Sequence, residues 1–486
     1  MTRTRLSPPL PGRSSLAAVA ALVSGVALLG VSPVRAGVTA AEAPSDLLAI
    51  PSAGAVRLGW ASAGPDDTGY RITASTGRTW RVRADSAESG AQAVRLTGLR
   101  NGVAVRFRVS AISHRGVGPP SSPSSSVTPR HPAGRGQWTT ARPLHLSRSG
   151  ASPLRLRNGT VLVFGGFEAG GTSERKTLEA YNPRTGAWSA PRPMDRSRSE
   201  FTATLLQDGR VLVTGGYTSL SAVHRSAAIY NAATGRWFAA APMHKVRARH
   251  TATLLTDGRV LVVGGATGTG LPRYTAEFYD PRTNRWSQTA SLHVARYGHS
   301  ATRLRDGRLL VVGGTDGFEG LRSAEIYDPA TGMWTTTSRM SVTREFDTVC
   351  CKGTVLLNSG KVLVAGGSDG AANRRVSRSA EIYDPATGTW SATGAMRVGR
   401  AWGGRFVRLA DGKVLAVGGG DDYGALRHAE TYDERTARWT RVNDLELLRT
   451  SPAVVTLADG RVLVAGGSTN FLGDSARRSA ELFRPA

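Results

Sequence analysis

The stretch Asp257-Gly-Arg-Val-Leu-Val-Val-Gly-Gly265 decides the fold of this chain, because similar stretches occur six more times. A short apolar run between a turn and a glycine pair is typical of a buried strand. The pairs recur at steps of 50, 49, 49, 53, 52 and 48 residues, beginning at Gly165, Gly215, Gly264, Gly313, Gly366, Gly418 and Gly466. Such a period indicates an array of structural repeats.

Each repeat continues with a second strand pattern, such as Ser323-Ala-Glu-Ile-Tyr-Asp-Pro329. A Thr-Gly turn and a tryptophan complete it, as in Thr387-Gly-Thr-Trp390. Residues 136–486 therefore resemble an array of Kelch repeats. The resemblance implies a seven-bladed β-propeller with one four-stranded blade in each repeat. It also implies that the repeated tryptophan, tyrosine and Gly-Gly positions are structural.

The two ends of the array indicate how the ring closes. Trp138 has no Gly-Gly pair before it, and the last repeat ends at Ser479-Ala-Glu-Leu-Phe-Arg-Pro485 with no tryptophan after it. We expect the segment around Trp138 to supply the missing outer strand of the last blade. This closure would remove exposed strand edges.

Residues 44–129 carry short alternating segments separated by Gly, Pro, Asp and Ser, which predicts a small β-sandwich. Leu58-Gly-Trp60, Gly69-Tyr-Arg-Ile72 and Phe107-Arg-Val-Ser-Ala111 resemble strands of a fibronectin type III domain. Val105 stands where that family has a tyrosine, so the hydrogen bond of that tyrosine is not expected. The resemblance implies a spacer or adhesion module, and the Pro/Ser-rich residues 118–135 predict a linker. The predicted fold class is all-β.

The N-terminus has the layout of an export signal. Arg3, Arg5 and Arg13 precede an apolar and small run over residues 16–30, and small residues follow it. We predict a signal peptide over residues 1–36, with cleavage as late as residue 43. A retained membrane anchor is the alternative, although the run is short and no later apolar run approaches ~18 residues. The expected location is secreted, extracellular or in the cell envelope, without a transmembrane segment after cleavage.

The charge balance favours an acidic partner. The 486 residues include 62 Lys and Arg against 36 Asp and Glu, which gives a net charge of +26. Arginine binds carboxylates, sulfates and phosphates through paired N–H donors. A nucleic-acid partner is not expected, because no nucleic-acid-binding motif is present. Two cysteines exclude a disulfide scaffold and a cysteine-based zinc finger.

One arginine precedes the predicted inner strand of every repeat. On a propeller these residues would surround the central mouth, where a ring of guanidinium groups would attract a polyanion. The alternative is that they belong to the repeat scaffold and bond backbone carbonyls between blades. The seven residues are Arg148, Arg198, Arg247, Arg296, Arg344, Arg400 and Arg449.

Other candidate ligand-binding residues differ between repeats, which favours contact with a ligand. Aromatic side chains beside arginines and carboxylates suit sugars, although exposed loops are polar without any ligand. The candidates before or within the inner strands, and in one loop after a Gly-Gly pair, are Glu200, His250, Tyr297, His299, Asp347, Trp402 and Tyr423.

The repeat that begins at Arg344 contains an insertion with both cysteines of the chain, Cys350 and Cys351. Adjacent cysteines can form a strained disulfide, because their Cα atoms are only ~3.8 Å apart in a trans peptide. Two thiols are the alternative.

Exported Kelch propellers joined to a sandwich domain also resemble galactose oxidase and its relatives. That family needs two Tyr, two His and a Cys cross-linked to one Tyr. Here the cysteines lie outside the family's position, and no Tyr-His dipeptide occurs. We therefore assign no catalytic residue, metal or cofactor.

The sequence favours an exported, monomeric, non-enzymatic protein that binds an acidic polysaccharide or protein. The alternatives are a carbohydrate-active enzyme, either a copper oxidase with a degenerate site or a polysaccharide lyase, and a structural envelope protein.

Overall fold

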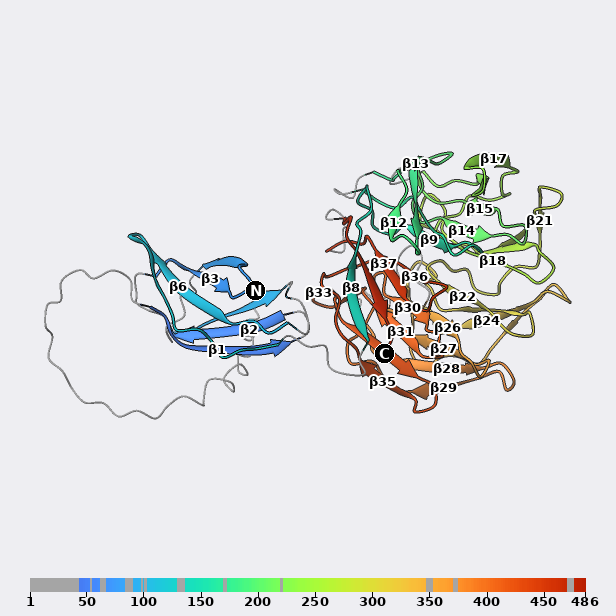
Figure 1. Ribbon diagram of the computed structural model, residues 1–486. Helices are drawn as coiled ribbons and strands as arrows, with labels where there is room; N and C mark the ends of the chain where they lie inside the picture. The colour runs from blue at the N-terminus through green and yellow to red at the C-terminus, as the bar shows by residue number, and fades with distance from the viewer. Residues whose placement is uncertain are drawn as a thin grey trace, which may run out of the picture. The chain divides into compact units, whose positions relative to one another are not determined.

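The computed structural model describes residues 43–52, 55–61, 67–83, 91–97, 99, 103–128, 136–168, 173–218, 222–346, 353–369, 375–469 and 476–486. The expected signal peptide, Asp347, Cys350, Cys351 and residues 129–135 of the expected linker lie outside these residues. Within them every regular element is a β-strand, so the all-β prediction is confirmed (Figure 1). This part of the chain holds no helix long and apolar enough to span a membrane. The chain divides into two compact units near residue 130.

The N-terminal unit contains two sheets that share one core. The rings of Trp60 and Tyr70 meet edge to face in that core, with their centroids 5.1 Å apart. One sheet has the order β1 (Ser45–Ser52), β2 (Ala55–Ala61), β5 (Ala91–Thr97). The other has the order β4 (Thr79–Arg83), β3 (Gly69–Ala74), β6 (Phe107–Ser113), β7 (Gly116–Pro120).

The described strands between residues 136 and 486 form seven antiparallel sheets of one design, besides a short hairpin. Each sheet starts with an inner strand, continues with the apolar strand that leads into Gly-Gly, and then with the tyrosine strand. The first three are β9 (Ser152–Arg155), β10 (Val161–Phe164), β11 (Thr177–Asn182), β12 (Ala187–Trp188) with β13 (Arg192–Pro193); β14 (Thr202–Leu205), β15 (Val211–Thr214), β16 (Ala227–Asn231), β17 (Arg236–Ala240); and β18 (Thr251–Leu254), β19 (Val260–Val263), β20 (Ala276–Asp280), β21 (Arg285–Gln288).

The remaining four sheets repeat this order, and the hairpin of β32 (Gly420–Asp421) and β33 (Gly424–Ala425) follows one Gly-Gly pair. They are β22 (Ser300–Arg303), β23 (Leu309–Val312), β24 (Ala324–Asp328), β25 (Met333–Thr336); β26 (Thr354–Leu356), β27 (Val362–Ala365), β28 (Ala380–Asp384), β29 (Thr389–Thr393); β30 (Arg405–Arg408), β31 (Val414–Val417), β34 (Ala429–Asp433), β35 (Arg438–Arg441); and β36 (Ala453–Thr456), β37 (Val462–Ala465), β38 (Ala480–Arg484), β8 (Gln137–Ala141).

The outer strand of the last sheet comes from the start of this unit. β8 pairs antiparallel with β38, and Trp138 lies opposite Phe483. The indole of Trp138 donates a 2.6 Å hydrogen bond to the carbonyl of Asn443. Residues more than 300 positions apart in the sequence therefore complete one sheet.

The inner strands contact one another in the cyclic order β9, β14, β18, β22, β26, β30, β36 and back to β9. Apolar clusters lie between neighbouring sheets, with Leu212, Ile229, Val260 and Tyr279 together in one of them. Close packing explains the glycine pairs: Gly215 has a φ of 62°, and a Cβ there would lie 2.3 Å from the carbonyl oxygen of Arg247 in the next repeat. The sheets thus surround a common axis.

Candidate functional site

The seven repeated arginines are buried in the scaffold, with 0 to 1% of each residue exposed. Arg148 shows the shared geometry: its Nη1 donates to the carbonyls of Gly165 at 2.9 Å and Thr177 at 3.0 Å. Its Nη2 pairs with Oε1 of Glu179 at 2.9 Å. Five others also pair with a buried glutamate on the tyrosine strand: Arg247 with Glu277, Arg296 with Glu325, Arg344 with Glu381, Arg400 with Glu430 and Arg449 with Glu481.

The interpretation of these arginines as a ligand-facing ring is therefore wrong, and the scaffold interpretation describes them. Arg198 differs only in its acid, since it pairs with Asp195 at 2.8 Å. Desolvation by burial lowers the pKa of Arg148, while Glu179 opposes this shift. Each guanidinium joins the end of one Gly-Gly strand to the start of the next strand. A ligand at the axis would not reach these groups.

His250 and His299 also pack inside the protein. Nε2 of His250 lies 3.1 Å from the hydroxyls of Thr202 and Thr214, and Nε2 of His299 lies 2.9 Å from that of Thr251. Burial lowers the pKa of His250 to about 3 and lowers that of His299 well below its usual value. Both imidazoles are therefore neutral at physiological pH, and they pack against glycine pairs as Phe201 does. This packing gives both histidines a structural role.

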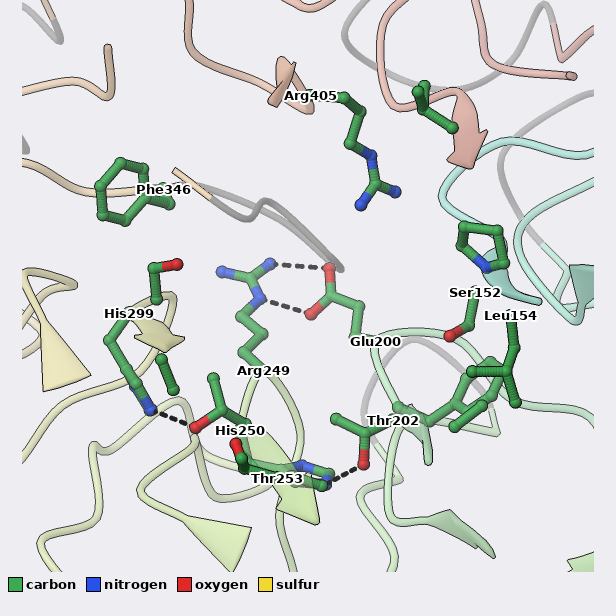
Figure 2. A pocket seen from close by; sticks show the side chains of 18 of the residues that line it. Ser152, Leu154, Glu200, Thr202, Arg249, His250, Thr253, His299, Phe346 and Arg405 are labelled. Carbon is green, nitrogen blue, oxygen red and sulfur yellow. Dashed lines mark hydrogen bonds and ion pairs between the residues drawn. The ribbon is translucent and has the colours of Figure 1, made fainter. Parts of the chain in front are cut away.

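A cavity of about 360 Å³ lies on the axis of the C-terminal unit. Residues of the inner strands β9, β14, β18, β22, β30 and β36 line it, and Figure 2 shows many of their side chains. Hydroxyl groups are frequent on its wall and belong to Ser152, Thr202, Thr251, Thr253, Ser300 and Thr456. A cavity of this size with convergent polar groups suits a small ligand or one unit of a larger one.

An ion pair between neighbouring sheets stands at this cavity. Glu200 precedes β14, Arg249 precedes β18, and both have a φ of 53°. Nε of Arg249 binds Oε2 of Glu200, and Nη2 of Arg249 binds Oε1 of Glu200 at 3.2 Å. The Arg249 guanidinium also lies over the ring of Tyr297, 5.7 Å from its centroid. In Figure 2 the side chains of Glu200 and Arg249 point toward one another in the cavity.

Backbone hydrogen bonds hold these residues in a collar, defined here as Gly150, Glu200, Arg249, Gly298, Phe346 and Ser451. Four of their amides reach the preceding repeat: Arg249 N donates to Glu200 O at 3.0 Å, and Gly298 N to Arg249 O at 3.1 Å. Phe346 N donates to Gly298 O at 3.1 Å, and Gly150 N to Ser451 O at 3.0 Å. The collar therefore fixes where Arg249 and Phe346 meet the cavity.

Arg405 is a further cation at the cavity, and its place there was not expected from the sequence. It is the first residue of β30, at the position that Ser152, Thr202, Thr251 and Ser300 occupy in their strands. The residue is 6% exposed, and its Nε donates to the carbonyl of Pro452 at 3.0 Å. Its guanidinium points into the cavity (Figure 2). An alignment of the inner strands would have shown this departure from the repeat.

Arg249 was also not expected, because the repeat pattern points to Arg247, two residues earlier. The signal was the glycine at the equivalent place in two sibling repeats, Gly150 and Gly298, which marks a left-handed backbone. Of the other candidates, Glu200, His250 and His299 line the cavity, and Tyr297 contacts Arg249. Trp402 and Tyr423 do not line it, and Tyr423 is 96% exposed in the β32–β33 hairpin.

Comparisons with known proteins agree with this arrangement. The model of the KLHDC2/KLHL20/DRC7 Kelch-repeats domain matches residues 249–467, and the Kelch motif model matches residues 157–195. The C-terminal unit is a Kelch β-propeller. A search of curated proteins finds no significant match.

The propeller is also similar to a solved fungal structure described as a novel alcohol oxidase with catalytic diversity among the AA5 family, in complex with copper. The two share 20% identity over 72% of this chain and 76% of the other, with a TM-score of 0.58. This likeness shows the fold alone. The described part of the propeller has no group of three His, Cys, Asp or Glu residues placed to hold a metal ion. Nε2 of His250 and of His299 is hydrogen-bonded to a threonine hydroxyl.

Proposed function

We propose that this chain is an exported, monomeric, non-enzymatic binding protein whose Kelch propeller takes an acidic group of its ligand into the axial cavity. The ligand is an acidic polysaccharide or an acidic segment of a protein. The observation that carries the proposal is Arg405, a cation that faces the cavity where four sibling strands carry a hydroxyl. The two Kelch matches support a binding or interaction role.

The cavity offers two guanidinium groups that can bind one carboxylate or sulfate. Arg249 and Arg405 reach it from different sheets, with Glu200 as the only carboxylate among its described lining residues. Glu200 and Tyr297 orient Arg249, and the Pro452 carbonyl orients Arg405. Guanidinium groups held in this way bind oxyanions with little loss of side-chain entropy. The hydroxyls of the wall suit the hydroxyls of a sugar.

The remaining parts of the proposal have separate support. Seven sheets whose inner strands contact in cyclic order favour a seven-bladed propeller. The two sheets of the N-terminal unit and its Trp60–Tyr70 core favour a fibronectin type III-like spacer. The basic and apolar pattern of residues 1–36 favours export.

The test replaces Arg405 by the residue that sibling strands carry. Arg405→Ser should weaken binding of polygalacturonate or heparin oligosaccharides at least about tenfold, because a charge-assisted contact at a desolvated site is lost. Arg282→Ser is the matched control, since it removes one charge from a side chain that is 75% exposed. Calorimetric titration at several salt concentrations gives the affinities. Equal affinities of the two variants, or binding that ignores salt, would contradict the proposal.

A further inference from the structure

A second group of arginines stands at the other end of the inner strands, beside the turns that follow them. Arg155, Arg303 and Arg408 are the last residues of β9, β22 and β30, and all three are exposed. Arg157 and Arg305 follow two residues after the first two and are also exposed. We call these five residues the arginine arc.

The arc follows one side of the axial opening. In the cyclic order of inner strands, β26 separates β22 from β30, and β36 separates β30 from β9. The arc therefore extends over five successive sheets. The other two inner strands, β14 and β18, end in Leu205 and Leu254. The arginines are thus confined to these five sheets, among which β26 ends in Leu356 and β36 ends in Thr456.

The arc is held by neutral acceptors rather than by carboxylates. Arg303 Nη1 donates to Leu254 O at 3.1 Å, Arg157 Nη2 to Gln207 O at 2.6 Å, and Arg408 Nη1 to Asn358 Oδ1 at 3.1 Å. Arg305 Nη2 donates to the carbonyl of Asn358. These bonds order the guanidinium groups and leave their charges in place. None of the five forms an ion pair with another described residue.

The acids of the adjacent turns already have partners. Asp208, Asp306 and Asp459 each pair with an arginine two residues later, at 2.7, 2.7 and 2.6 Å. Asp257 and Asp411 do the same with Arg259 and Lys413, at 2.7 and 3.0 Å. These local pairs neutralise the turns in the described structure. The positive potential at this opening therefore comes from the arc.

The arc is continuous with the axial cavity, because Arg155 and Thr456 line the same 360 Å³ space as Arg249. A ligand bound at the arc can thus place a neighbouring unit against the hydroxyls of the inner strands. Sites for single-stranded nucleic acid combine arginines with aromatic side chains that stack on bases. Here the inner strands end in Arg, Leu or Thr, so their ends offer no aromatic side chain on which a base could stack.

We infer that the arginine arc is a second binding surface and that its partner is an acidic polysaccharide, whose repeated carboxylate or sulfate groups bind the guanidinium groups while the chain crosses the opening. The inference goes beyond the proposed function and does not depend on Arg405. Several weak charged contacts along one chain then act together, because the first contact raises the effective concentration for the next.

The experiment compares two triple variants of the mature chain. Arg155→Ser/Arg303→Ser/Arg408→Ser removes three charges from the arc, and Arg184→Ser/Arg282→Ser/Arg435→Ser removes three exposed charges from outer turns. Binding to heparin and to polygalacturonate should fall at least about tenfold in the arc variant and less than about threefold in the control. The arc variant should also show a weaker dependence of affinity on salt.

Other outcomes separate the arc from its alternatives. Equal losses in both triples would show an effect of net charge only, and preferential binding of single-stranded DNA of matched charge would replace the polysaccharide by a nucleic acid. A loss in Arg405→Ser with none in the arc variant would overturn this inference and keep the proposed function, and the reverse would keep the arc alone. The single variant Arg155→Glu is the check against misfolding. The Arg155 side chain is exposed at the end of β9, so this variant should weaken binding without lowering Tm.

Discussion

Single residues decide which charges reach the axis of the propeller. Arg247 and Arg249 are separated by one residue. Arg247 is buried, pairs with Glu277 and donates to two carbonyls, whereas Arg249 reaches the cavity. The difference is the left-handed backbone at Arg249, which changes the direction of its side chain. Glu200 has the same φ in the preceding repeat and meets Arg249 across the gap between two sheets.

His250 should make the stability of the propeller sensitive to acid. The unfolded chain binds a proton near the ordinary histidine value of 6.5, whereas the folded pKa is about 3. Below pH 6.5 the unfolded state therefore binds the extra proton, and stability falls as pH falls toward 3. Between pH 6.5 and 5 this loss is about 2 kcal/mol, at about 1.4 kcal/mol for each pH unit.

Urea unfolding of the wild type and of His250→Phe at several pH values tests this expectation. Phenylalanine fills the equivalent place at Phe201, so the variant should fold and lose about 2 kcal/mol less than the wild type over that interval. Phe201→Leu is the control, because it disturbs the same packing position without a titratable group. Parallel pH profiles for the wild type and His250→Phe would show that this histidine does not titrate as described.

At the scale of one sheet, the buried arginine–glutamate pair connects the loop before the inner strand to the tyrosine strand. Glu325 accepts a 2.8 Å bond from Nη2 of Arg296 and receives the amides of His293 and Val294 at 2.8 and 3.2 Å. One carboxylate thus satisfies both the arginine and the loop that leads into β22. The same design in five other sheets explains why an arginine recurs in the sequence.

Arg296→Leu should destabilise the propeller by about 3–5 kcal/mol, because it removes the cation that pairs with the buried Glu325 and a donor to two carbonyls. Arg285→Leu, at an exposed position of β21, should change the free energy of unfolding by less than about 0.5 kcal/mol. Chemical denaturation measures both. A loss below about 1 kcal/mol for Arg296→Leu would mean that this pair does not support the sheet.

The sequence predicts the sheets well and the cavity poorly, for a physical reason. Glycine pairs, apolar runs and the Tyr–Trp pattern act within about 40 residues, so their spacing shows the repeat directly. The cavity depends on pairs from different repeats, such as Glu200 with Arg249, which are 49 positions apart. Spacing along the chain does not tell whether a side chain turns toward the axis or into the space between sheets. For this reason the pattern left two interpretations of the seven arginines open, and Arg405 was overlooked.

At the scale of the whole molecule, one short strand joins the two ends of the propeller. Trp138 in β8 is 8% exposed, packs on Phe483 with centroids 4.9 Å apart and donates a 2.6 Å bond to Asn443 O. Trp286, in the middle of the array, is 9% exposed and donates a 2.6 Å bond to Ala241 O. Their surroundings match, although Trp138 lies near the start of the unit.

Trp138→Ala should therefore cost the same as Trp286→Ala, about 3–5 kcal/mol each, because both remove a buried indole between packed strands. An open array would behave differently, since its end strand would fray at little cost to the other repeats. Thermal unfolding followed by calorimetry should show one transition of the propeller shifted to lower temperature by the same amount in both variants. A small shift for Trp138→Ala beside a large one for Trp286→Ala would mean that β8 does not close the ring.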